Sequence, residues 1–197
     1  MNMKVLGILR GVTSDAIEPI VETAISSGLE TIEITMNTPD APCLIKKAIG
    51  HARGRLVIGA GTVLNRKDLA FALEAGASFI VMPVIEEEVI AQCVKDNIPV
   101  FPGALTPNEI FKAWSLGAAM VKVFPAKFFG PKYFKEINGP FNDIKLLACG
   151  GVTPENKNDY LSNGASAISF GSSVFRKEWL AEGDFDLIGA AIKAFIA

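Results

Sequence analysis

The stretch Met120-Val121-Lys122-Val123-Phe124-Pro125 is typical of the short strands on which this chain is built. Its two valines suit one apolar face of an alternating strand, and they leave the residues between them for the opposite face. Similar runs recur at steps of roughly 20 to 27 residues, about the length of one strand, one helix and two short loops. The strand candidates begin near Lys4, Thr31, Leu56, Phe79, Pro99, Met120, Lys145 and Ala167.

Eight strands that alternate with helical stretches predict an α/β fold, and in particular a closed (β/α)8 TIM barrel at the small end of that class. A doubly wound open sheet is the structural alternative. No linker, low-complexity tract or change of composition divides the chain. We therefore expect residues 1–197 to form a single barrel domain.

Two local signals support the helical stretches. A glycine closes several of them just before the next strand, as expected for a helix C-terminus that needs a left-handed residue: Gly28, Gly76, Gly117 and Gly164. Thr38-Pro39 and Thr106-Pro107 look like N-caps followed by a proline in the first turn.

The composition excludes several classes of protein. The net charge is −2 and there is no basic block, so we expect neither a nucleic-acid nor a membrane partner. No apolar run is long enough to cross a bilayer. Three widely separated cysteines predict reduced thiols and a cytoplasmic setting. One histidine without a Cys/His cluster predicts that no metal is bound.

Lys122 is the least expected residue of its strand. Burial of an unpaired ammonium is costly, so this lysine must reach water, find a partner or lose its proton. Strand alternation turns Lys122 into the barrel, and the same alternation in Thr31-Ile32-Glu33-Ile34-Thr35 turns Glu33 inward. A core ion pair is one interpretation, but such a pair adds little net stability over apolar packing. A nucleophilic amine beside a proton carrier is what carbonyl chemistry requires, so we predict a catalytic pair.

Three turns rich in glycine or hydroxyl groups are expected at strand ends. They are Gly59-Ala60-Gly61-Thr62 after the third strand, Gly150-Gly151 after the seventh and Gly171-Ser172-Ser173 after the eighth. Loops after the seventh and eighth strands of such barrels often bind phosphate through bare backbone N–H groups. The sequence therefore predicts a phosphorylated ligand. No dinucleotide-binding or P-loop motif is present.

Short motifs spread over nearly the whole chain resemble those of the family of 2-keto-3-deoxy-6-phosphogluconate and 4-hydroxy-2-oxoglutarate aldolases, the class I pyruvate aldolases. Each motif is short, but their combination and order are specific to that family. The matching segments are Ile8-Leu9-Arg10-Gly11, Ile32-Glu33-Ile34-Thr35, Gly59-Ala60-Gly61-Thr62-Val63, Pro102-Gly103, Lys122-Val123-Phe124-Pro125, Gly150-Gly151-Val152 and Gly171-Ser172.

The resemblance implies a role for each matched residue. Lys122 corresponds to the lysine that forms a Schiff base with the substrate, and Glu33 to the general acid and base. The resemblance further implies substrate contacts by Arg10, Thr62, Pro83, Phe124, Gly151 and Ser172. Additional candidate contacts are Asn37, Cys149, Gly150 and Gly171. Members of the family are lyases of the Entner-Doudoroff type that use no metal and no cofactor, and they are usually homotrimers.

The expected substrate is a phosphorylated 2-keto sugar acid. The resemblance implies cleavage of 2-keto-3-deoxy-6-phosphogluconate to pyruvate and glyceraldehyde 3-phosphate, and of 4-hydroxy-2-oxoglutarate to pyruvate and glyoxylate. The galactonate epimer is an alternative, as is a barrel that binds or isomerises sugar phosphates without aldol chemistry. Asn37 stands where many members have arginine, and Cys149 where many have threonine. Asn37 and the segment Phe129-Gly130-Pro131 are similar to the galactonate branch, whereas Gly139-Pro140-Phe141 is similar to the gluconate branch.

Overall fold

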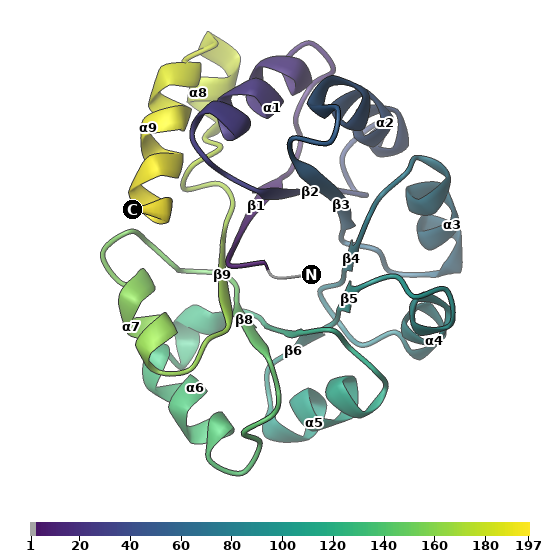
Figure 1. Ribbon diagram of the computed structural model, residues 1–197, viewed down its shortest axis with the longest axis vertical. Helices are drawn as coiled ribbons and strands as arrows, with labels where there is room; N and C mark the ends of the chain where they lie inside the picture. Colours follow the sequence, from purple (N-terminus) through teal and green to yellow (C-terminus); the bar gives the residue numbers. More distant parts are fainter. Residues whose placement is uncertain (1–2) are drawn as a thin grey trace.

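The computed structural model describes residues 3–197, which form a nearly closed parallel barrel surrounded by helices (Figure 1). The strands pair in the order β5-β4-β3-β2-β1-β9-β8-β7-β6, and every pairing is parallel. The pairing of the first strand with the last one excludes the open doubly wound alternative. The strands are β1 (Val5–Leu9), β2 (Thr31–Thr35), β3 (Val57–Gly61), β4 (Ile80–Val81), β5 (Val100–Phe101), β6 (Gly103–Ala104), β7 (Val121–Val123), β8 (Leu146–Ala148) and β9 (Ala167–Phe170).

Nine strands appear where eight were predicted because the fifth one is divided at Pro102. Proline has no backbone N–H to give to a ladder, so regular pairing stops at this residue. The interrupted strand still closes the barrel. The carbonyl of Phe101 accepts from the N–H of Met82 at 3.1 Å, and that of Pro102 accepts from the N–H of Lys122 at 2.8 Å. Strands β5 and β6 are thus two halves of one barrel position.

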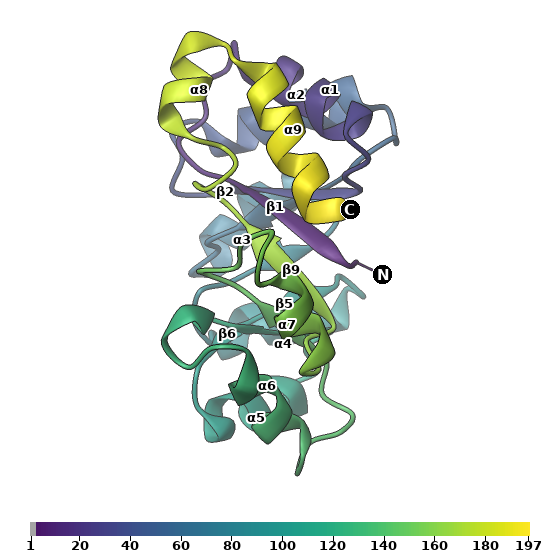
Figure 2. The ribbon, with the colours of Figure 1, turned by 90° about the vertical axis from the view of Figure 1, so that its left-hand side faces the viewer.

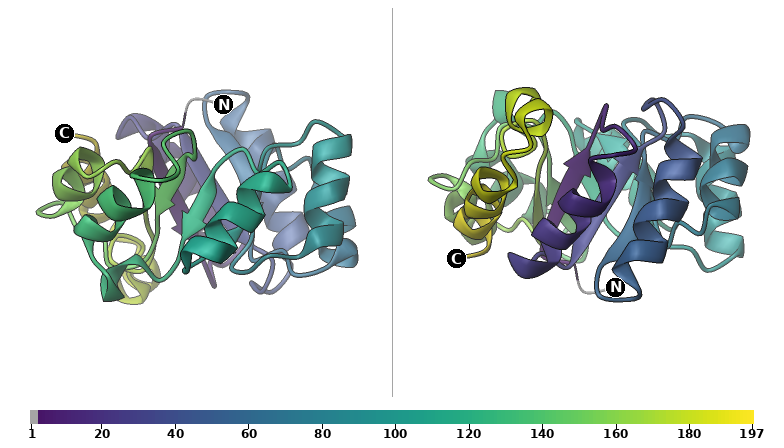
Figure 3. Two further views of the ribbon diagram at one scale, coloured as in Figure 1. Left: turned by 90° about the horizontal axis from the view of Figure 1, so that it is seen from below. Right: turned by 90° about the horizontal axis from the view of Figure 1, so that it is seen from above.

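Helices follow the strands around the outside of the barrel. In Figure 2, α8 and α9 lie on the same side of the molecule as α1, and Figure 3 (right) shows α1 between α2 and α9. The helices are α1 (Ile17–Ser26), α2 (Ala41–Ala52), α3 (Arg66–Glu74), α4 (Glu87–Lys95), α5 (Pro107–Ser115), α6 (Pro131–Asn138), α7 (Lys157–Ser162), α8 (Lys177–Glu182) and α9 (Phe185–Ile196), with a 3-10 turn, η1 (Ala126–Phe128), after β7.

The predicted glycine signals at helix ends are confirmed. Gly28 has φ +84°, and its N–H donates to the carbonyl of Ile25 while Leu29 N–H reaches back to Ala24. This is the Schellman arrangement, which satisfies carbonyls that the helix end leaves free. The same pair of bonds recurs after α3, α5 and α7, so one local device returns the chain to the sheet each time.

One of the two predicted N-caps is confirmed and the other is wrong. Thr106 accepts from Glu109 N–H at 3.3 Å, and the Glu109 carboxylate accepts from Thr106 N–H at 2.8 Å, which is a capping box. Helix α2 instead begins after Asp40, whose side chain makes no cap hydrogen bond. The hydroxyl of Thr38 is used elsewhere, in contacts with the loop after β1.

Apolar side chains fill two separate regions. The larger core lies between the strands and the helices, and includes Ile32 and Ile34 of β2. A smaller cluster fills the interior of the barrel. Its members are Met3, Leu6, Phe79, Val81, Phe101, Met120, Leu147 and Ala167. The alternation predicted for the strands is therefore present, because residues on one side face the helices and residues on the other face the barrel axis.

The glycines of the third strand do not form the predicted turn. Gly59 and Gly61 both lie within β3. A Cβ on Gly59 would lie 2.5 Å from the ring of Phe79, and one on Gly61 would lie 2.3 Å from the Glu33 carboxylate. Because neighbouring strands fill this space with large side chains, β3 must present bare backbone to the barrel interior.

Candidate active site

Lys122 is the middle residue of β7 and enters the barrel as its sequence alternation predicted. Its neighbours in the sheet are Gly103 of β6 and Leu147 of β8. The residue is only 6% exposed, and its Nζ lies 5.3 Å from the centroid of the Phe124 ring. The ammonium therefore lies beside an aromatic face at a nearly buried position in the barrel.

Glu33 is the middle residue of β2 and is completely buried. Neither carboxylate oxygen has a hydrogen-bond partner in residues 3–197. Buried polar groups are nearly always paired, so an orphaned carboxylate marks a place where a ligand or water completes the site. Burial raises the pKa of Glu33, and the positive charges of Lys122 and Arg10 oppose that rise.

Glu33 and Lys122 share the barrel interior without forming the ion pair that the sequence left open. In residues 3–197 no salt bridge joins them, although the charge of Lys122 acts on the pKa of Glu33. The two groups are close enough to interact electrostatically and leave each other free for chemistry. A buried carboxylate whose pKa is raised above its ordinary value is suited to take up and return protons.

Arg10 and Thr62 meet at the carboxyl ends of β1 and β3. The Nη2 of Arg10 donates to Oγ1 of Thr62 at 3.4 Å. Thr62 has φ +56°, a left-handed conformation that is costly for a β-branched residue. Such strain tends to occur at functional sites, where a side chain must be held in one direction. Here it turns the Thr62 hydroxyl toward the arginine.

A buried network of threonines supports the loop that carries Arg10. The hydroxyls of Thr35 and Thr38 lie 3.1 Å apart, and Thr38 Oγ1 accepts from the N–H of Gly11 at 2.9 Å. Strand alternation predicts that Thr35 faces the barrel interior, whereas the sequence predicts only a helix cap for Thr38. No local pattern around Thr38 could predict its contact with Gly11, because the two residues are distant in sequence.

The predicted phosphate loops border one cavity of about 500 Å³. Gly150 and Gly151 have φ values of +89° and +88°, which explains why this loop needs two glycines. The walls of the cavity include Ile8, Arg10, Phe124, Cys149, Gly150, Gly151, Val152, Thr153, Ser169, Phe170, Gly171, Ser172 and Ser173. Predicted contacts from β1, β7, β8 and β9 are thus brought together. Ser173 belongs to the predicted loop Gly171-Ser172-Ser173, whereas Thr153 and Ser169 also line the cavity and had been assigned no role from the sequence.

Phe124 separates this cavity from a second one of about 390 Å³. The second cavity is lined by Pro83 and the residues after it, together with Gly103 to Leu105. The carbonyl of Pro83 would lie 2.2 Å from a Cβ on Gly103, so these two loops are in tight contact. Pro83 and Phe124 therefore both line the second cavity, whereas Asn37 is exposed and lines neither cavity.

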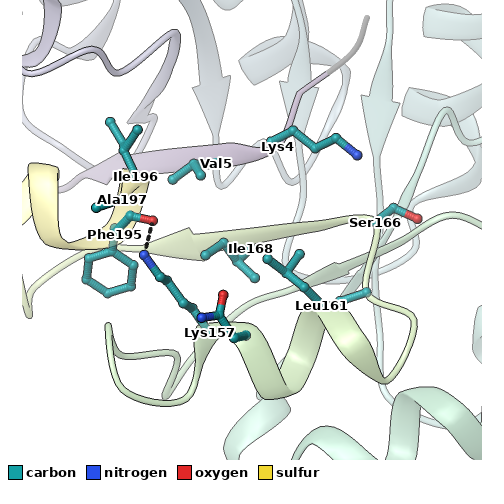
Figure 4. A pocket seen from close by; sticks show the side chains of 11 residues that line it. Lys4, Val5, Lys157, Leu161, Ser166, Ile168, Phe195, Ile196 and Ala197 are labelled. Carbon is teal, nitrogen blue, oxygen red and sulfur yellow. Dashed lines mark hydrogen bonds between the residues drawn. The ribbon is translucent and has the colours of Figure 1, made fainter.

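A third cavity, of about 460 Å³, lies at the opposite end of the barrel (Figure 4). It lies near the start of β1 and the end of α9, and neither Lys122 nor Glu33 lines it. Its buried lysine, Lys157, donates to the carbonyls of Ala194 at 2.9 Å and Phe195 at 3.0 Å. Lys157 thus closes the last turn of α9, where a cation is favourable. Among the described residues that line this cavity there is no aspartate, glutamate or histidine side chain to carry a proton.

Two further features concern the class of protein. None of the helices in residues 3–197 has the length and apolar character required to span a bilayer. The same part of the chain contains no group of three or more metal-binding side chains.

Comparison with known proteins gives the chain a family. Residues 1–191 match the model of the KDPG and KHG aldolase family, where KDPG is 2-keto-3-deoxy-6-phosphogluconate. The chain is 34% identical over 195 residues to 2-dehydro-3-deoxy-6-phosphogalactonate aldolase of Escherichia coli K12, which covers 98% of this chain and 95% of that protein. It is 37% identical over 145 residues to 2-dehydro-3-deoxy-phosphogluconate aldolase of Pseudomonas aeruginosa, covering 73% and 66% of the two chains.

A solved structure of the same family has a similar fold. The KDPG aldolase of Legionella pneumophila, with pyruvate captured as a covalent carbinolamine, superposes with a TM-score of 0.91 at 26% identity, over 98% of this chain and 94% of that one. The match to the family model extends over nearly the whole chain and includes every strand of the barrel. The chain therefore belongs to the KDPG and KHG aldolase family, and it is an aldolase, a lyase that cleaves carbon–carbon bonds.

Proposed function

We propose that Lys122 forms a Schiff base with the C2 carbonyl of a 2-keto sugar acid, with Glu33 as the proton carrier. The observation that supports this most directly is the fully buried Glu33 carboxylate, which has no hydrogen-bond partner and lies within the electrostatic reach of Lys122. Such a pair adds little to stability, but it provides a nucleophile and a base at one place. The carbinolamine in the Legionella pneumophila relative supports the same chemistry.

The proposed reaction begins with transfer of a proton from the Lys122 ammonium to Glu33, directly or through water, and the neutral amine then attacks C2. The carbinolamine loses water, with a proton supplied by Glu33 directly or through water, and a protonated imine remains. Glu33 then removes the proton of the C4 hydroxyl. The C3–C4 bond breaks, and its electron pair moves into the imine, leaving the enamine of pyruvate while an aldehyde departs. Protonation at C3 and hydrolysis release pyruvate and regenerate Lys122. No metal or organic cofactor is needed, because the imine accepts the electrons.

The substrate is proposed to be held at both ends. Arg10 and Thr62 lie at one side of the barrel mouth, where they suit the ketoacid carboxylate and carbonyl. The glycine loops Gly150-Gly151 and Gly171-Ser172 line the larger cavity together with Arg10, and their backbone N–H groups and hydroxyls suit a phosphate. These contacts favour an aldolase of a phosphorylated acid over an isomerase, which would have no use for a Schiff-base lysine.

Borohydride reduction in the presence of pyruvate tests the proposal directly. Reduction of the imine fixes pyruvate to the protein, and mass spectrometry of the digested protein identifies the modified lysine. We expect one adduct, on Lys122. An adduct on a different lysine, or none, would overturn the assignment. Lys127, five residues away and exposed, is an internal control because solvent-accessible lysines without a neighbouring carboxylate should stay unmodified.

The first substrate candidate is 2-keto-3-deoxy-6-phosphogluconate, cleaved to pyruvate and glyceraldehyde 3-phosphate, with 4-hydroxy-2-oxoglutarate as a further substrate. The galactonate epimer is a second candidate. It is favoured by Asn37 and by the Escherichia coli relative, which matches over 98% of this chain. The ratio of kcat/KM for the two phosphorylated epimers, measured as pyruvate release, decides between them. We expect the gluconate epimer to give the higher value, and a higher value for the galactonate epimer would replace it.

The assembly and setting are also part of the proposal. Residues 1–197 are proposed to act as one catalytic domain in a cytoplasmic homotrimer, without nucleic-acid or membrane partners. Phe129 is 55% exposed near the mouth of the barrel, which supports a subunit contact on this side. The cysteines are unpaired, as expected of a reducing compartment. Light scattering coupled to size exclusion measures the mass, and a monomer at micromolar concentration would contradict the trimer.

A further inference from the structure

Lys127 lies beside the Gly150-Gly151 loop and has no part in the proposed reaction. Its backbone N–H donates to the carbonyl of Gly150 at 2.9 Å. A Cβ on Gly151 would lie 2.4 Å from the Cβ of Lys127 and 3.3 Å from its Cγ. The aliphatic stem of the lysine therefore lies directly against the backbone of a loop that lines the larger cavity.

The charge of that cavity is low for a phosphate site. Among its lining residues within the described chain, Arg10 is the one with a charged side chain, and its guanidinium donates a hydrogen bond to Thr62. A phosphate monoester carries a charge of about −1.5 to −2 at neutral pH. Backbone N–H groups and serine hydroxyls orient such a group, but they offer it no full positive charge.

The ammonium of Lys127 is available to supply this charge. No ion pair engages it in residues 3–197. Its Nζ instead lies 5.3 Å from the centroid of the Phe128 ring, and that ring is 72% exposed. A cation–π contact at an exposed site is weak, so a phosphate dianion competes with it readily.

The other cation near the loops is less available. Arg176 follows the Gly171-Ser172-Ser173 loop, but its Nε donates to the carbonyl of Ser173 at 3.2 Å. Its guanidinium also lies 4.4 Å from the ring centroid of Trp179. Arg176 is therefore engaged in holding its own loop and helix α8, whereas the Lys127 side chain makes no such hydrogen bond to the loop beside it.

We infer that Lys127 is a phosphate-recognition residue of this aldolase, which moves its ammonium from the Phe128 ring to the substrate phosphate lying on Gly150-Gly151. This inference rests on the proposed function and adds to it a residue that distinguishes phosphorylated from unphosphorylated substrates. The stem stays against Gly151, so only the outer torsions of the side chain change. The expected contribution is to binding of the phosphorylated end and not to the chemical step.

Replacement by methionine tests the charge while keeping an apolar stem on Gly151. For Lys127→Met we expect KM for the phosphorylated sugar acid to rise about fivefold, the effect of one partly screened charge, with kcat unchanged. The same 2-keto-3-deoxy sugar acid without its phosphate should show no change in kcat/KM. Lys127→Arg should restore most of the loss. Lys132→Met, at an exposed lysine of α6, is the matched control and should leave both substrates unaffected.

Competitive inhibition by inorganic phosphate gives a second readout that does not depend on turnover of a phosphorylated substrate. The inhibition constant, measured with the unphosphorylated acid, should rise in Lys127→Met and stay unchanged in Lys132→Met. Equal losses on both substrates would show a structural role of the stem and overturn the inference, as would an unchanged KM and inhibition constant. Borohydride trapping of pyruvate involves no phosphate. If trapping on Lys122 succeeds and Lys127→Met has no effect, the inference alone fails, whereas failed trapping in the wild type removes the proposed function itself.

Discussion

The carboxylate of Glu33 occupies the space that a side chain at Gly61 would fill, since a Cβ there would lie 2.3 Å from Oε1 and 2.6 Å from Cδ. Gly61 ends β3, and in the sheet it is paired with Thr35, two residues beyond the glutamate. The position of the buried carboxylate thus depends on an absent side chain in the neighbouring strand. A candidate catalytic group is held here by close packing, because it has no hydrogen-bond partner in residues 3–197.

Gly61→Ala is expected to displace the Glu33 carboxylate and impair turnover. A shift of about 1 Å in a reacting group can reduce the rate by roughly a hundredfold, so we expect kcat to fall between tenfold and a hundredfold. The free energy of unfolding should fall by about 1–3 kcal/mol, as for other overpacked positions. Steady-state kinetics and urea denaturation measure the two effects.

Two other glycines serve as controls for that variant. Gly59→Ala places its Cβ 2.5 Å from the Phe79 ring, so it should cost stability through the interior cluster and reduce kcat less than Gly61→Ala does. Gly50→Ala, in α2, meets nothing within 4 Å and should leave both quantities nearly unchanged. If Gly59→Ala and Gly61→Ala lower kcat equally, the loss reflects general disruption and not the position of Glu33.

Glu33→Gln is expected to stabilise the folded protein while it abolishes activity. The folded-state pKa of Glu33 is raised above its ordinary value of 4.5 by burial, so folding favours the protonated form. The ionised carboxylate therefore lowers stability at neutral pH. This cost disappears as the pH falls through the raised pKa toward 4.5. Removal of the ionisable group should raise the free energy of unfolding by about 1 kcal/mol at pH 8.

The pH dependence separates this effect from ordinary repacking. The gain in Glu33→Gln should shrink steadily as the pH falls and vanish near the ordinary carboxyl value, when both proteins carry a neutral side chain at this position. Urea denaturation at a series of pH values measures the gain. A gain of constant size at every pH would show that the charge of Glu33 has no part in it.

Thr62 allows strain and function to be separated. Its φ of +56° disfavours any residue other than glycine, by about 1–2 kcal/mol. Thr62→Gly relieves that strain and removes the hydroxyl that accepts from Arg10, whereas Thr62→Ala removes the hydroxyl and keeps the strain. We expect Thr62→Gly to be the more stable of the two by about 1 kcal/mol, with KM for the ketoacid raised in both. Equal stabilities in the two variants would mean that the conformation is not strained in solution.

Lys122→Met should abolish turnover, by at least about a thousandfold in kcat, because Lys122 is the one lysine of residues 3–197 whose charge acts on the pKa of Glu33. The positive charge of Lys122 opposes the rise in the pKa of Glu33, so its removal leaves the buried carboxylate less compensated. Stability at neutral pH should therefore fall, and a second change, Glu33→Gln, should restore it. Circular dichroism and thermal unfolding of the single and double variants test this coupling. If the change in unfolding free energy of the double variant equals the sum of the changes in the two single variants, the two residues do not interact.

Several features of the site could be predicted from the sequence because they depend on local rules. Strand alternation has a period of two, so the inward direction of Lys122 and Glu33 followed from their apolar neighbours alone. The loops at Gly150 and Gly171 could be assigned to strand ends because parallel strands bring all their carboxyl ends to one rim. Neither result required knowledge of distant contacts.

Other features depended on which strands became neighbours. The sequence predicts a turn at Gly59 and Gly61, although glycine occurs both in turns and in tightly packed strands. The side chains of Phe79 and Glu33, which fill the space beside these glycines, show that the second use applies here. The sequence predicts a helix cap at Thr38, but in the structure its hydroxyl accepts a hydrogen bond from Gly11, which is distant in sequence. In both cases the outcome depends on a strand or loop that is distant in sequence and fills the neighbouring space.

By itself the sequence determined the alternation of strands and helices and the side of each strand that faces inward, since these depend on residues a few positions apart. Only the tertiary structure decided that Lys122 and Glu33 share the barrel interior without an ion pair, that Gly61 makes room for the carboxylate and that Asn37 stays outside both cavities. Those outcomes depend on volume and distance between segments far apart in the chain. Both the volumes and the distances between these segments are set when the barrel closes.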